Sequence, residues 1–220
     1  MSVRILQINT ALQEASVSIS ADGLLMDERI NPAQQEHAGF LQPAIAELCA
    51  SLNIALKDLQ AVAVVNGPGS YTGLRVGLSA AKGICFALKL PLILINTLEW
   101  MAKCNQHQAT ELICPMIDAR RMEVFTALYN QSLQPVLDPQ AMMLDPSSFQ
   151  ERLLQQSIAF VGDGAQKWQA ICENPHAHFP KTDLSASALS ALSIQAFREE
   201  KFADLAYSEP FYTKDFHTGK

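Results

Sequence analysis

Apolar residues are most regularly placed between residues 61 and 90. A short, continuous run of β-branched and small apolar residues, Ala61 to Val65, is closed by Asn66 and Gly67, which is typical of a strand buried on both faces. A glycine-rich turn follows directly, and a long helix is predicted to begin near Leu74. We interpret this strand, turn and helix as the unit around which the rest of the chain is organised.

The predicted helix is apolar over most of its circumference. A core-facing stripe follows the helical spacing i, i+4, i+7, i+11 and i+14: Leu74, Leu78, Ala81, Cys85 and Leu88. Charged residues form only a thin line that repeats every seven positions: Arg75, Lys82 and Lys89. Such a helix is buried on more than one side, so a second helix of the same domain or another chain is expected to cover it. The two interpretations are not exclusive.

The first half predicts a mixed sheet with helices. Alternation and turn residues indicate a meander of three strands and then a helix: Val3 to Asn9, Ser16 to Ser20, Leu24 to Ile30 and Pro32 to Asn53. Pro43 implies that this helix is kinked or starts later. After the central unit, a strand is predicted at Leu92 to Ile95 and a helix at Thr97 to Cys104. The order β-β-β-α-β-α-β is the ribonuclease-H-like arrangement.

The second half begins in the same way, which suggests an internal duplication. Its predicted elements are a strand, polar turn and strand, a third strand, a helix, a strand and two further helices: Leu112 to Phe125, Val136 to Leu144, Pro146 to Gln156, Ile158 to Val161, Ala165 to Cys172 and Ala186 to Lys201. We therefore predict two ribonuclease-H-like subdomains, residues 1–104 and 105–220, with a boundary segment at Asn105 to Thr110. The last helix is expected to pack back on the first subdomain, and the aromatic tail SEPFYTKDF to be packed down.

Composition fits a folded, intracellular protein. Of 220 residues, 49% are hydrophobic and 17% charged, which is enough apolar material for a sizeable core. The formal net charge of −6 argues against autonomous nucleic-acid binding, because that requires a concentrated lysine and arginine surface. Five widely spaced cysteines in apolar surroundings suit reduced thiols. No secretory signal or membrane span is recognisable, so a cytoplasmic location is expected.

The glycine-rich turn is the first candidate site. Its free backbone N–H groups and a nearby arginine could hold a nucleotide phosphate or another anion: Gly67, Gly69, Ser70, Thr72, Gly73 and Arg75. The alternative is that the glycines only permit a tight turn from strand to helix, with Ser70 or Thr72 as the helix cap. The turn is not a Walker loop, because no Gly-Lys-Ser/Thr sequence closes it.

The remaining polar candidates have simpler interpretations. His176 and His178 have no cysteine or carboxylate cluster near them in sequence, so a surface loop is expected rather than a metal site. Asp163 lies in a glycine turn and is expected to form that turn. A charged hairpin tip is predicted, with pairing within itself or with another domain or subunit: Asp118, Arg120, Arg121 and Glu123. Neither a His-Glu-x-x-His motif nor a nucleophile elbow is present, so no protease activity is expected.

Four sequence blocks together resemble the bacterial TsaB (YeaZ) family. They are NGPGSYTGLRVG, LQINTALQEASVSI before it, IDARRMEVF after it and SEPFYTK near the end, and they span nearly the whole chain. The resemblance implies the α/β fold of the actin, hsp70 and sugar-kinase group, with two ribonuclease-H-like halves, each a mixed sheet flanked by helices. It also implies a relationship to TsaD proteins, the larger catalytic subunits that the family accompanies.

The resemblance implies a non-catalytic scaffold in the synthesis of N6-threonylcarbamoyladenosine, at adenosine 37 of tRNAs that read ANN codons. TsaD and the ATPase TsaE are the implied partners, TsaC makes the threonylcarbamoyl adenylate, and ATP and Mg²⁺ belong to the partner subunits. The chain is expected to meet tRNA only through the complex. Alone, it is expected to hide its apolar helix in a homodimer.

Two departures from the relatives agree with a scaffold. Where TsaD proteins carry two metal-binding histidines four residues apart, this sequence has Thr97 and Met101, and neither side chain replaces an imidazole ligand. Relatives usually carry aspartate where this chain has Asn9, at the tip of the first strand. We therefore expect no catalytic residue, metal site or intrinsic cofactor in this chain.

The partner is expected to bind the helices at 39–53 and 74–89. The predicted interface residues are His37, Leu41, Ile45, Arg75, Val76, Gly77, Ala80 and Ile84. The alternative function is a stand-alone nucleotide phosphatase or phosphotransferase of the same fold, which would use the glycine-rich turn and Arg75.

Overall fold

The computed structural model describes residues 2–32, 36–109 and 111–213, and the chain divides into two compact units. Unit 1 comprises Met1–Thr97 and Ser185–Phe211, and unit 2 comprises Leu98–Leu184 and Tyr212–Lys220. The boundary expected after residue 104 therefore falls inside unit 2, and the last helix belongs to unit 1. Parts of the predicted first helix, boundary segment and tail lie outside the described residues.

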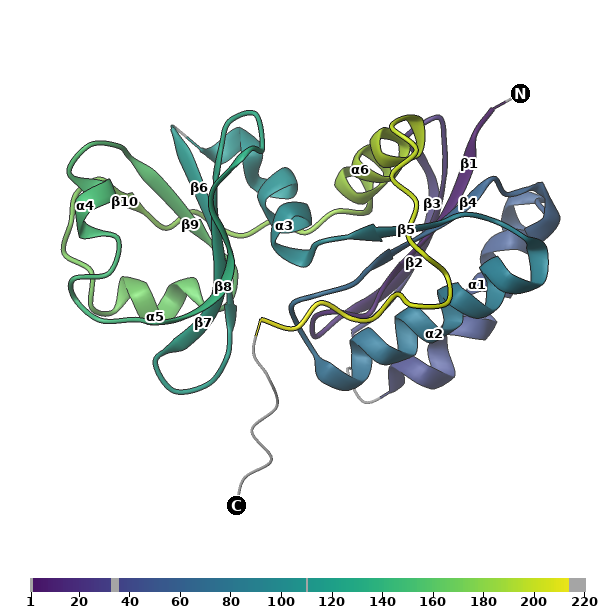
Figure 1. Ribbon diagram of the computed structural model, residues 1–220, viewed down its shortest axis with the longest axis horizontal. Helices are drawn as coiled ribbons and strands as arrows, with labels where there is room; N and C mark the ends of the chain where they lie inside the picture. Colours follow the sequence, from purple (N-terminus) through teal and green to yellow (C-terminus); the bar gives the residue numbers. More distant parts are fainter. Residues whose placement is uncertain (1, 33–35, 110, 214–220) are drawn as a thin grey trace, which may run out of the picture. The chain divides into compact units, whose positions relative to one another are not determined.

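Unit 1 is built on a five-stranded mixed sheet (Figure 1). In the order β3-β2-β1-β4-β5, its strands are Leu24–Asn31, Ala15–Ala21, Arg4–Asn9, Ala61–Val65 and Leu92–Ile95. The first three strands of the chain form the predicted antiparallel meander, whereas β4 and β5 run parallel to β1. All five side chains of β4 are buried, as its continuous apolar run predicts.

Helices cover both faces of this sheet (Figure 1). On one face, α1 (His37–Leu52) packs against β2 and β3, and α2 (Tyr71–Leu88) packs against β1, β4, β5 and α1. On the other face, α6 (Ala186–Arg198) packs against β1, β2, β3 and β5. The main core of unit 1 forms where α1 and α2 meet the sheet, and its strand residues include Leu6, Ile8, Val17, Ile19, Val62 and Val64.

The sheet face beneath α6 carries buried polar side chains. The Gln7 carboxamide lies 3.0 Å from Ser18 Oγ and 2.6 Å from Ser20 Oγ. On α6, the buried hydroxyls of Ser190 and Ser193 donate to backbone carbonyls one turn earlier, at 2.9 and 2.7 Å. Because each of these polar groups has a partner, the small serine side chains let α6 lie close to the sheet without a desolvation penalty.

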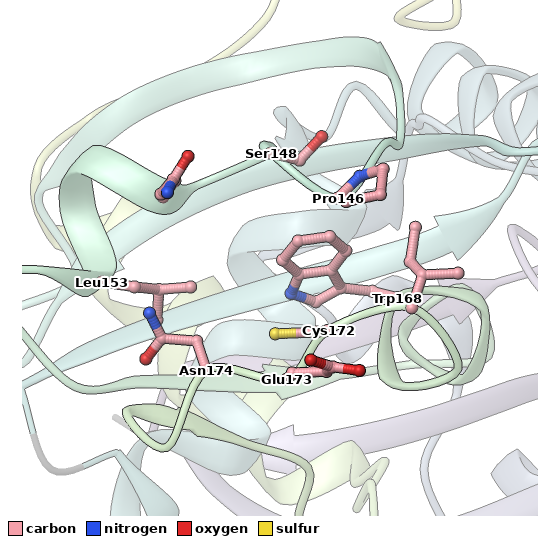
Figure 2. Close-up of a pocket in the computed structure, with 9 residues that line it drawn as sticks. Pro146, Ser148, Leu153, Trp168, Cys172, Glu173 and Asn174 are labelled. Atoms are coloured by element: carbon pink, nitrogen blue, oxygen red, sulfur yellow. The ribbon is translucent and has the colours of Figure 1, made fainter.

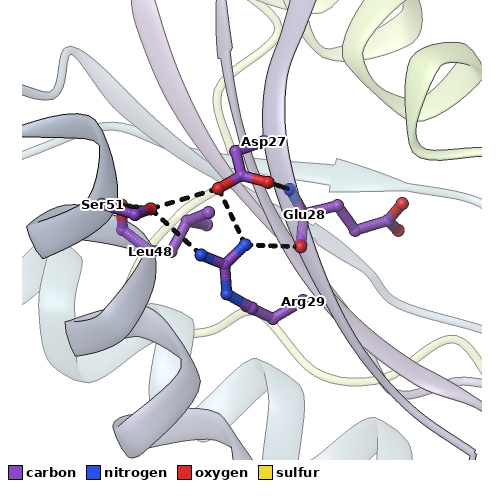
Figure 3. A network of polar contacts seen from close by, with 5 residues as sticks. All are labelled: Asp27, Glu28, Arg29, Leu48 and Ser51. Atoms are coloured by element: carbon purple, nitrogen blue, oxygen red, sulfur yellow. Dashed lines mark hydrogen bonds and ion pairs between the residues drawn. The ribbon is translucent and has the colours of Figure 1, made fainter.

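The edge strand β3 is fastened to α1 by a polar network (Figure 3). Arg29 Nη1 lies 2.8 Å from Asp27 Oδ2, and Arg29 Nη2 donates to Ser51 Oγ at 3.1 Å. Ser51 Oγ also lies 3.1 Å from Asp27 Oδ2 and 3.0 Å from the Leu48 carbonyl oxygen. The hydrogen bond from Arg29 lowers the pKa of Asp27, which keeps this carboxylate charged.

Unit 2 repeats the sheet of unit 1. In the order β10-β9-β6-β7-β8, its strands are Ala177–His178, Ile158–Val161, Leu112–Asp118, Glu123–Asn130 and Pro135–Met143. The strands β6, β7 and β8 pair antiparallel, and β9 and β10 run parallel to β6, which is the arrangement of β1 to β5. The fold is therefore the predicted one, with two ribonuclease-H-like sheets in the manner of the actin, hsp70 and sugar-kinase group.

The helices of unit 2 are shorter than predicted. After α3 (Thr97–Asn105), the described part of unit 2 forms the short helices α4 (Gln150–Leu153) and α5 (Ala165–Gln169), whereas helices were expected over 146–156 and 165–172. The Asp145 carboxylate accepts hydrogen bonds from the Ser147 backbone and the hydroxyls of Ser147 and Ser148, so a local turn replaces the first part of α4. Strand β10 pairs with β9 where a surface loop was predicted.

The helices of unit 1 also differ from the predicted bounds. Helix α1 begins at His37 and carries Pro43 inside it, and α2 begins at Tyr71 rather than near Leu74. Pro43 is exposed, so the surrounding core does not have to accommodate its ring. Within the described residues, no helix combines the length and the apolar character that crossing a membrane requires.

Helix α2 lies directly on the sheet because it has glycine where it passes β1. A Cβ atom at Gly77 would clash with Thr10 Oγ1 and would lie 3.5 Å from side-chain atoms of Ile8 and Val64. By contrast, nothing lies within 4 Å of the Cβ position of Gly83, on the same helix. Gly77 therefore sets the distance between helix and sheet, whereas Gly83 does not.

We expect Gly77→Ala to lower the free energy of unfolding by about 1–3 kcal/mol, because the added methyl group overpacks the contact between helix and sheet. Gly83→Ala is the matched control, and we expect it to raise the free energy of unfolding by up to about 1 kcal/mol, because alanine has the higher helix propensity. Urea unfolding followed by circular dichroism measures both. Equal effects of the two substitutions would contradict this packing account.

Candidate functional site

The glycine-rich turn is held by neighbouring backbone on three sides. The Ser70 N–H donates to the Ala11 carbonyl at 2.7 Å, which ties the turn to the end of β1. The Thr97 N–H donates to the Gly67 carbonyl at 2.9 Å, and the Phe211 N–H donates to the Asn66 carbonyl at 2.7 Å. The turn is thus joined to the loop after β1, to the end of β5 and to the C-terminal segment.

The glycines permit these close contacts. A Cβ atom at Gly69 would clash with the Ala11 carbonyl oxygen, one at Gly73 with the Thr10 carbonyl oxygen, and one at Gly67 with the Phe211 carbonyl oxygen. Gly67 also has a φ of +121°, which favours glycine. The requirement for glycine is therefore explained by packing alone, and the anion site stays a prediction.

Ser70 is the N-cap of α2. Its Oγ accepts a hydrogen bond from the Gly73 N–H at 3.3 Å, and its carbonyl accepts one from the Leu74 N–H at 2.8 Å. This cap explains why the helix begins earlier than expected. Thr72, the other predicted cap, is an exposed residue in the first turn of the helix.

Arg75 is exposed on the outer side of α2. Its guanidinium carbon lies 3.9 Å from the ring centroid of Tyr71, which is a cation–π contact. Tyr71 is 39% exposed, so the pair forms part of the helix surface. The side chain is therefore accessible, and its role at an interface stays a prediction.

Burial within unit 1 corrects half of the predicted interface. Leu41 and Ile45 are core residues of α1, His37 is buried with Nε2 3.2 Å from the Gln13 carbonyl oxygen, and Gly77 faces the sheet. These four residues cannot lie in a partner surface while unit 1 is folded. The predicted residues that keep some exposure are Arg75, Val76, Ala80 and Ile84.

The surface available to a partner consists mostly of residues that were not predicted as interface residues, with Arg75 as the exception. We call it the outer helical face, and it comprises Ala38, Gly39, Gln42, Pro43 and Ala46 of α1 and Thr72, Arg75, Ser79, Gly83 and Phe86 of α2. Phe86 is 80% exposed, which is unusual for phenylalanine. The α2 members have the spacing i, i+3, i+7, i+11 and i+14, so the signal was a second stripe beside the core-facing one.

The outer helical face is nearly free of charge and of bulk. Arg75 is its single charged member, and nothing lies within 4 Å of the Cβ positions of Gly39 and Gly83. The two helices that form it, α1 and α2, pack against each other on the same face of the sheet (Figure 1). A surface with a single charge, mostly small side chains and one projecting aromatic ring can admit helices of another chain at close range.

The hairpin tip between β6 and β7 forms its ion pair with α5. Asp118 Oδ1 lies 2.5 Å from Lys167 Nζ, and the Asp118 N–H donates to Asp163 Oδ1 at 2.9 Å. Asp163 thus holds the turn after β9 to the end of β6. Within the tip, the Arg120 N–H also donates to Asp118 Oδ1, so Asp118 bonds both inside the tip and to α5.

The described residues include no cluster of possible metal ligands, and the pKa values of two buried thiols are raised. The described residues contain no group of three or more histidine, cysteine, aspartate or glutamate side chains that could hold a metal ion. Burial raises the pKa of Cys85 to about 11 and that of Cys114 to about 12, so both thiols stay protonated at neutral pH. Asn9 Oδ1 accepts a hydrogen bond from the Ala11 N–H at 3.1 Å and so holds the turn after β1.

Comparison with known proteins identifies the family. A family model described as TsaD, tRNA N6-adenosine threonylcarbamoyltransferase, matches residues 30–212. A relative from Escherichia coli (strain K12), named tRNA threonylcarbamoyladenosine biosynthesis protein TsaB, is 32% identical over 172 residues, which is 76% of this chain and 74% of the relative. The chain belongs to the TsaB (YeaZ) family.

Two further relatives agree with this assignment. The TsaB protein of Bacillus subtilis (strain 168) is 34% identical over 143 residues, which is 64% of this chain and 62% of that protein, so the match spans less than two thirds of its length. A crystal structure from Pseudomonas aeruginosa, described as an uncharacterized protein with similarity to peptidase YEAZ, has a TM-score of 0.81 at 22% identity and covers 96% of this chain and 100% of that one. The structural likeness shows that the two chains share a fold over nearly the whole of this chain.

The ion pair at the hairpin tip predicts a pH-dependent contribution to stability. The hydrogen bond from Lys167 lowers the pKa of Asp118 in the folded chain, so its contribution is present above about pH 4 and is lost as the pH falls through the folded pKa. Because the Asp118 side chain is 41% exposed, we expect Asp118→Asn to cost less than about 1 kcal/mol at pH 7.

Thermal unfolding of the wild type and of Asp118→Asn between pH 2 and pH 7 measures this effect. Asp138→Asn is the control, since the described residues supply no ion-pair partner for that exposed aspartate. A difference between wild type and Asp118→Asn that persists at pH 2 would show that the carboxylate charge is not the cause.

Proposed function

We propose that this chain is a non-catalytic subunit in the biosynthesis of threonylcarbamoyladenosine in tRNA, and that it pairs with a TsaD protein. The Escherichia coli and Bacillus subtilis relatives carry this biosynthetic role in their names. The observation that carries the pairing is the outer helical face, a surface of two packed helices on which Arg75 is the single charged member and from which Phe86 projects. In this proposal, that face binds the other chain and stabilises the active site that the other chain contains.

The residues at the positions of the TsaD metal ligands support the non-catalytic part of the proposal. Thr97 and Met101 are both buried, and neither carries the imidazole that the resemblance assigns to TsaD. Asn9, where relatives usually have aspartate, uses its carboxamide oxygen to hold a turn. ATP and Mg²⁺ are therefore assigned to the partner subunits, and we propose no intrinsic cofactor.

Charge and surface support the remaining assignments. With a formal net charge of −6, the chain is proposed to meet tRNA only through the complex, and TsaE to join through the pair with TsaD. The outer helical face would otherwise stay exposed, so a symmetric homodimer is proposed for the chain alone. The proposed location is the cytoplasm, where tRNA modification takes place.

Phe86→Glu tests the pairing, because a charge would replace the largest exposed apolar side chain of the outer helical face. We expect it to weaken binding to the TsaD homologue of the same organism by at least about thirtyfold, as at a central interface residue. Leu154→Glu is the matched control, since Leu154 is 76% exposed but lies in unit 2. Gel filtration with light scattering measures complex formation, and circular dichroism checks that both variants fold.

Co-elution of Phe86→Glu with the partner at wild-type affinity would overturn the assigned surface. Loss of binding in both variants would indicate a general charge effect. Failure of the wild type to bind under any condition would favour the alternative, a nucleotide phosphatase or phosphotransferase. That alternative requires metal-dependent turnover of ATP or GTP by the purified chain, with loss of turnover in Arg75→Ala.

A further inference from the structure

Unit 2 contains a pocket beside its short helices α4 and α5. The two sheets have the same strand order, but α4 and α5 have 4 and 5 residues, whereas α1 and α2 have 16 and 18. The loops that flank α4 and α5 complete the cover of the unit 2 sheet. Between these loops lies a pocket of about 470 Å³, which is within the range of small-molecule sites (Figure 2).

The pocket contains a buried hydrogen-bond donor without a partner. Trp168 is 1% exposed, and its Nε1 makes no hydrogen bond within the described residues. Its ring is fixed by Phe149 and Phe160, whose centroids lie 5.9 and 6.0 Å away. In Figure 2 the indole nitrogen faces the part of the pocket where Leu153 and Asn174 lie. A buried N–H group without an acceptor is unfavourable, so this geometry favours a bound acceptor.

Asn174 offers a second donor on the same side. Its Oδ1 accepts a hydrogen bond from the His176 N–H at 2.9 Å, which fixes the carboxamide and leaves Nδ2 as the group that can donate. Figure 2 shows this carboxamide on the side of the pocket that the indole nitrogen faces, near Leu153, with Cys172 nearer to the nitrogen. Two N–H donors on one side of a pocket are suited to a carbonyl oxygen, because that atom has two lone pairs.

The other lining residues constrain the polarity and the charge of a ligand. Leu153 is buried and, with Pro146 and Ile171, gives the pocket an apolar wall. Glu173 is the charged residue of the lining, and no lysine, arginine or histidine belongs to it. A negative charge without a compensating cation disfavours anionic ligands, including phosphates and carboxylates.

We propose that this pocket binds a small, uncharged organic molecule that carries a carbonyl group on an apolar or aromatic body. The carbonyl oxygen accepts hydrogen bonds from Trp168 Nε1 and Asn174 Nδ2. The apolar body lies against Leu153 and Ile171. This site lies within unit 2, so it is independent of the outer helical face and of pairing with TsaD.

Indole N–H signals in ¹⁵N–¹H NMR spectra of the full chain test the proposal. The chain has two tryptophans, so Trp100 serves as an internal control and Trp168→Phe assigns the signals. Three probes of similar size separate the effect of the carbonyl acceptor from the effect of charge. Benzamide has the carbonyl and no charge, benzoate adds a negative charge, and toluene lacks the acceptor. We expect benzamide to move the Trp168 signal saturably, with an affinity about tenfold above that of toluene.

Two variants check the assigned contacts. Asn174→Asp keeps the acceptor for the His176 N–H but removes the second donor, and we expect it to weaken benzamide binding about tenfold. Gln155→Glu, an exposed position of unit 2 outside the pocket lining, is the charge-matched control and should leave the affinity unchanged. Glu173→Gln should strengthen benzoate binding about two- to fivefold, because it removes the like charge.

Equal shifts with all three probes, or shifts that grow linearly up to the solubility limit, would overturn the proposal and leave water as the occupant of the pocket. An unchanged benzamide affinity in Asn174→Asp would overturn the assigned second donor. If Trp168→Phe does not fold, the probe series and the Asn174→Asp comparison still decide the outcome. None of these outcomes tests the pairing with TsaD, which is measured by complex formation of the Phe86→Glu variant.

Discussion

The direct contact between the start of α2 and the end of β1 is the constraint on which unit 1 depends. Glycines at 73 and 77 bring the helix against Thr10, and the Ser70 N–H bonds the Ala11 carbonyl. Backbone carbonyls of the same turn accept hydrogen bonds from the Thr97 and Phe211 N–H groups. The turn therefore connects the ends of β1 and β5, the two strands beside β4, with the C-terminal segment. One side of α2 therefore packs against the sheet, and its opposite side is the one that another molecule can contact.

The two units share a strand order but use their helical covers differently. In unit 1, two long helices seal the core and present the outer helical face. In unit 2, two short helices and their loops cover the sheet, and an aromatic cluster around Phe160 and Trp168 fills the core. A duplicated sheet can therefore carry long helices with the proposed partner surface in one copy and a small pocket in the other, because the sheet does not determine the length of the helices over it.

The strands and the duplication could be predicted from the sequence because their patterns are local. The continuous apolar run at 61–65 marks a buried strand, and alternation marks the meander before it. The exposed side of α2 could not be predicted in the same way, since Gly77 and Gly83 look alike in sequence and differ only in what lies opposite them. The predicted interface was wrong at Leu41, Ile45 and Gly77 for this reason: all three are apolar or small, and the chain's own core uses them.

The roles of the glycine-rich turn and the pocket also could not be predicted from sequence, because both depend on residues that are distant along the chain. A run of glycines is compatible with anion binding and with close backbone packing, and the carbonyl groups of Thr10, Ala11 and Phe211 that explain it are distant in sequence. The unpaired donor of Trp168 likewise depends on how loops after β8 and α5 come together, which a tryptophan in an apolar segment does not reveal.

Hydrogen–deuterium exchange on this chain, alone and with the TsaD homologue of the same organism, would locate the partner surface. We expect slower exchange in peptides from α1 and α2 when the partner is present, because their outer side becomes covered, and unchanged exchange in α4 and α5. A complex that forms with protection confined to unit 2, or with none in α1 and α2, would contradict the claim that the outer helical face receives the partner.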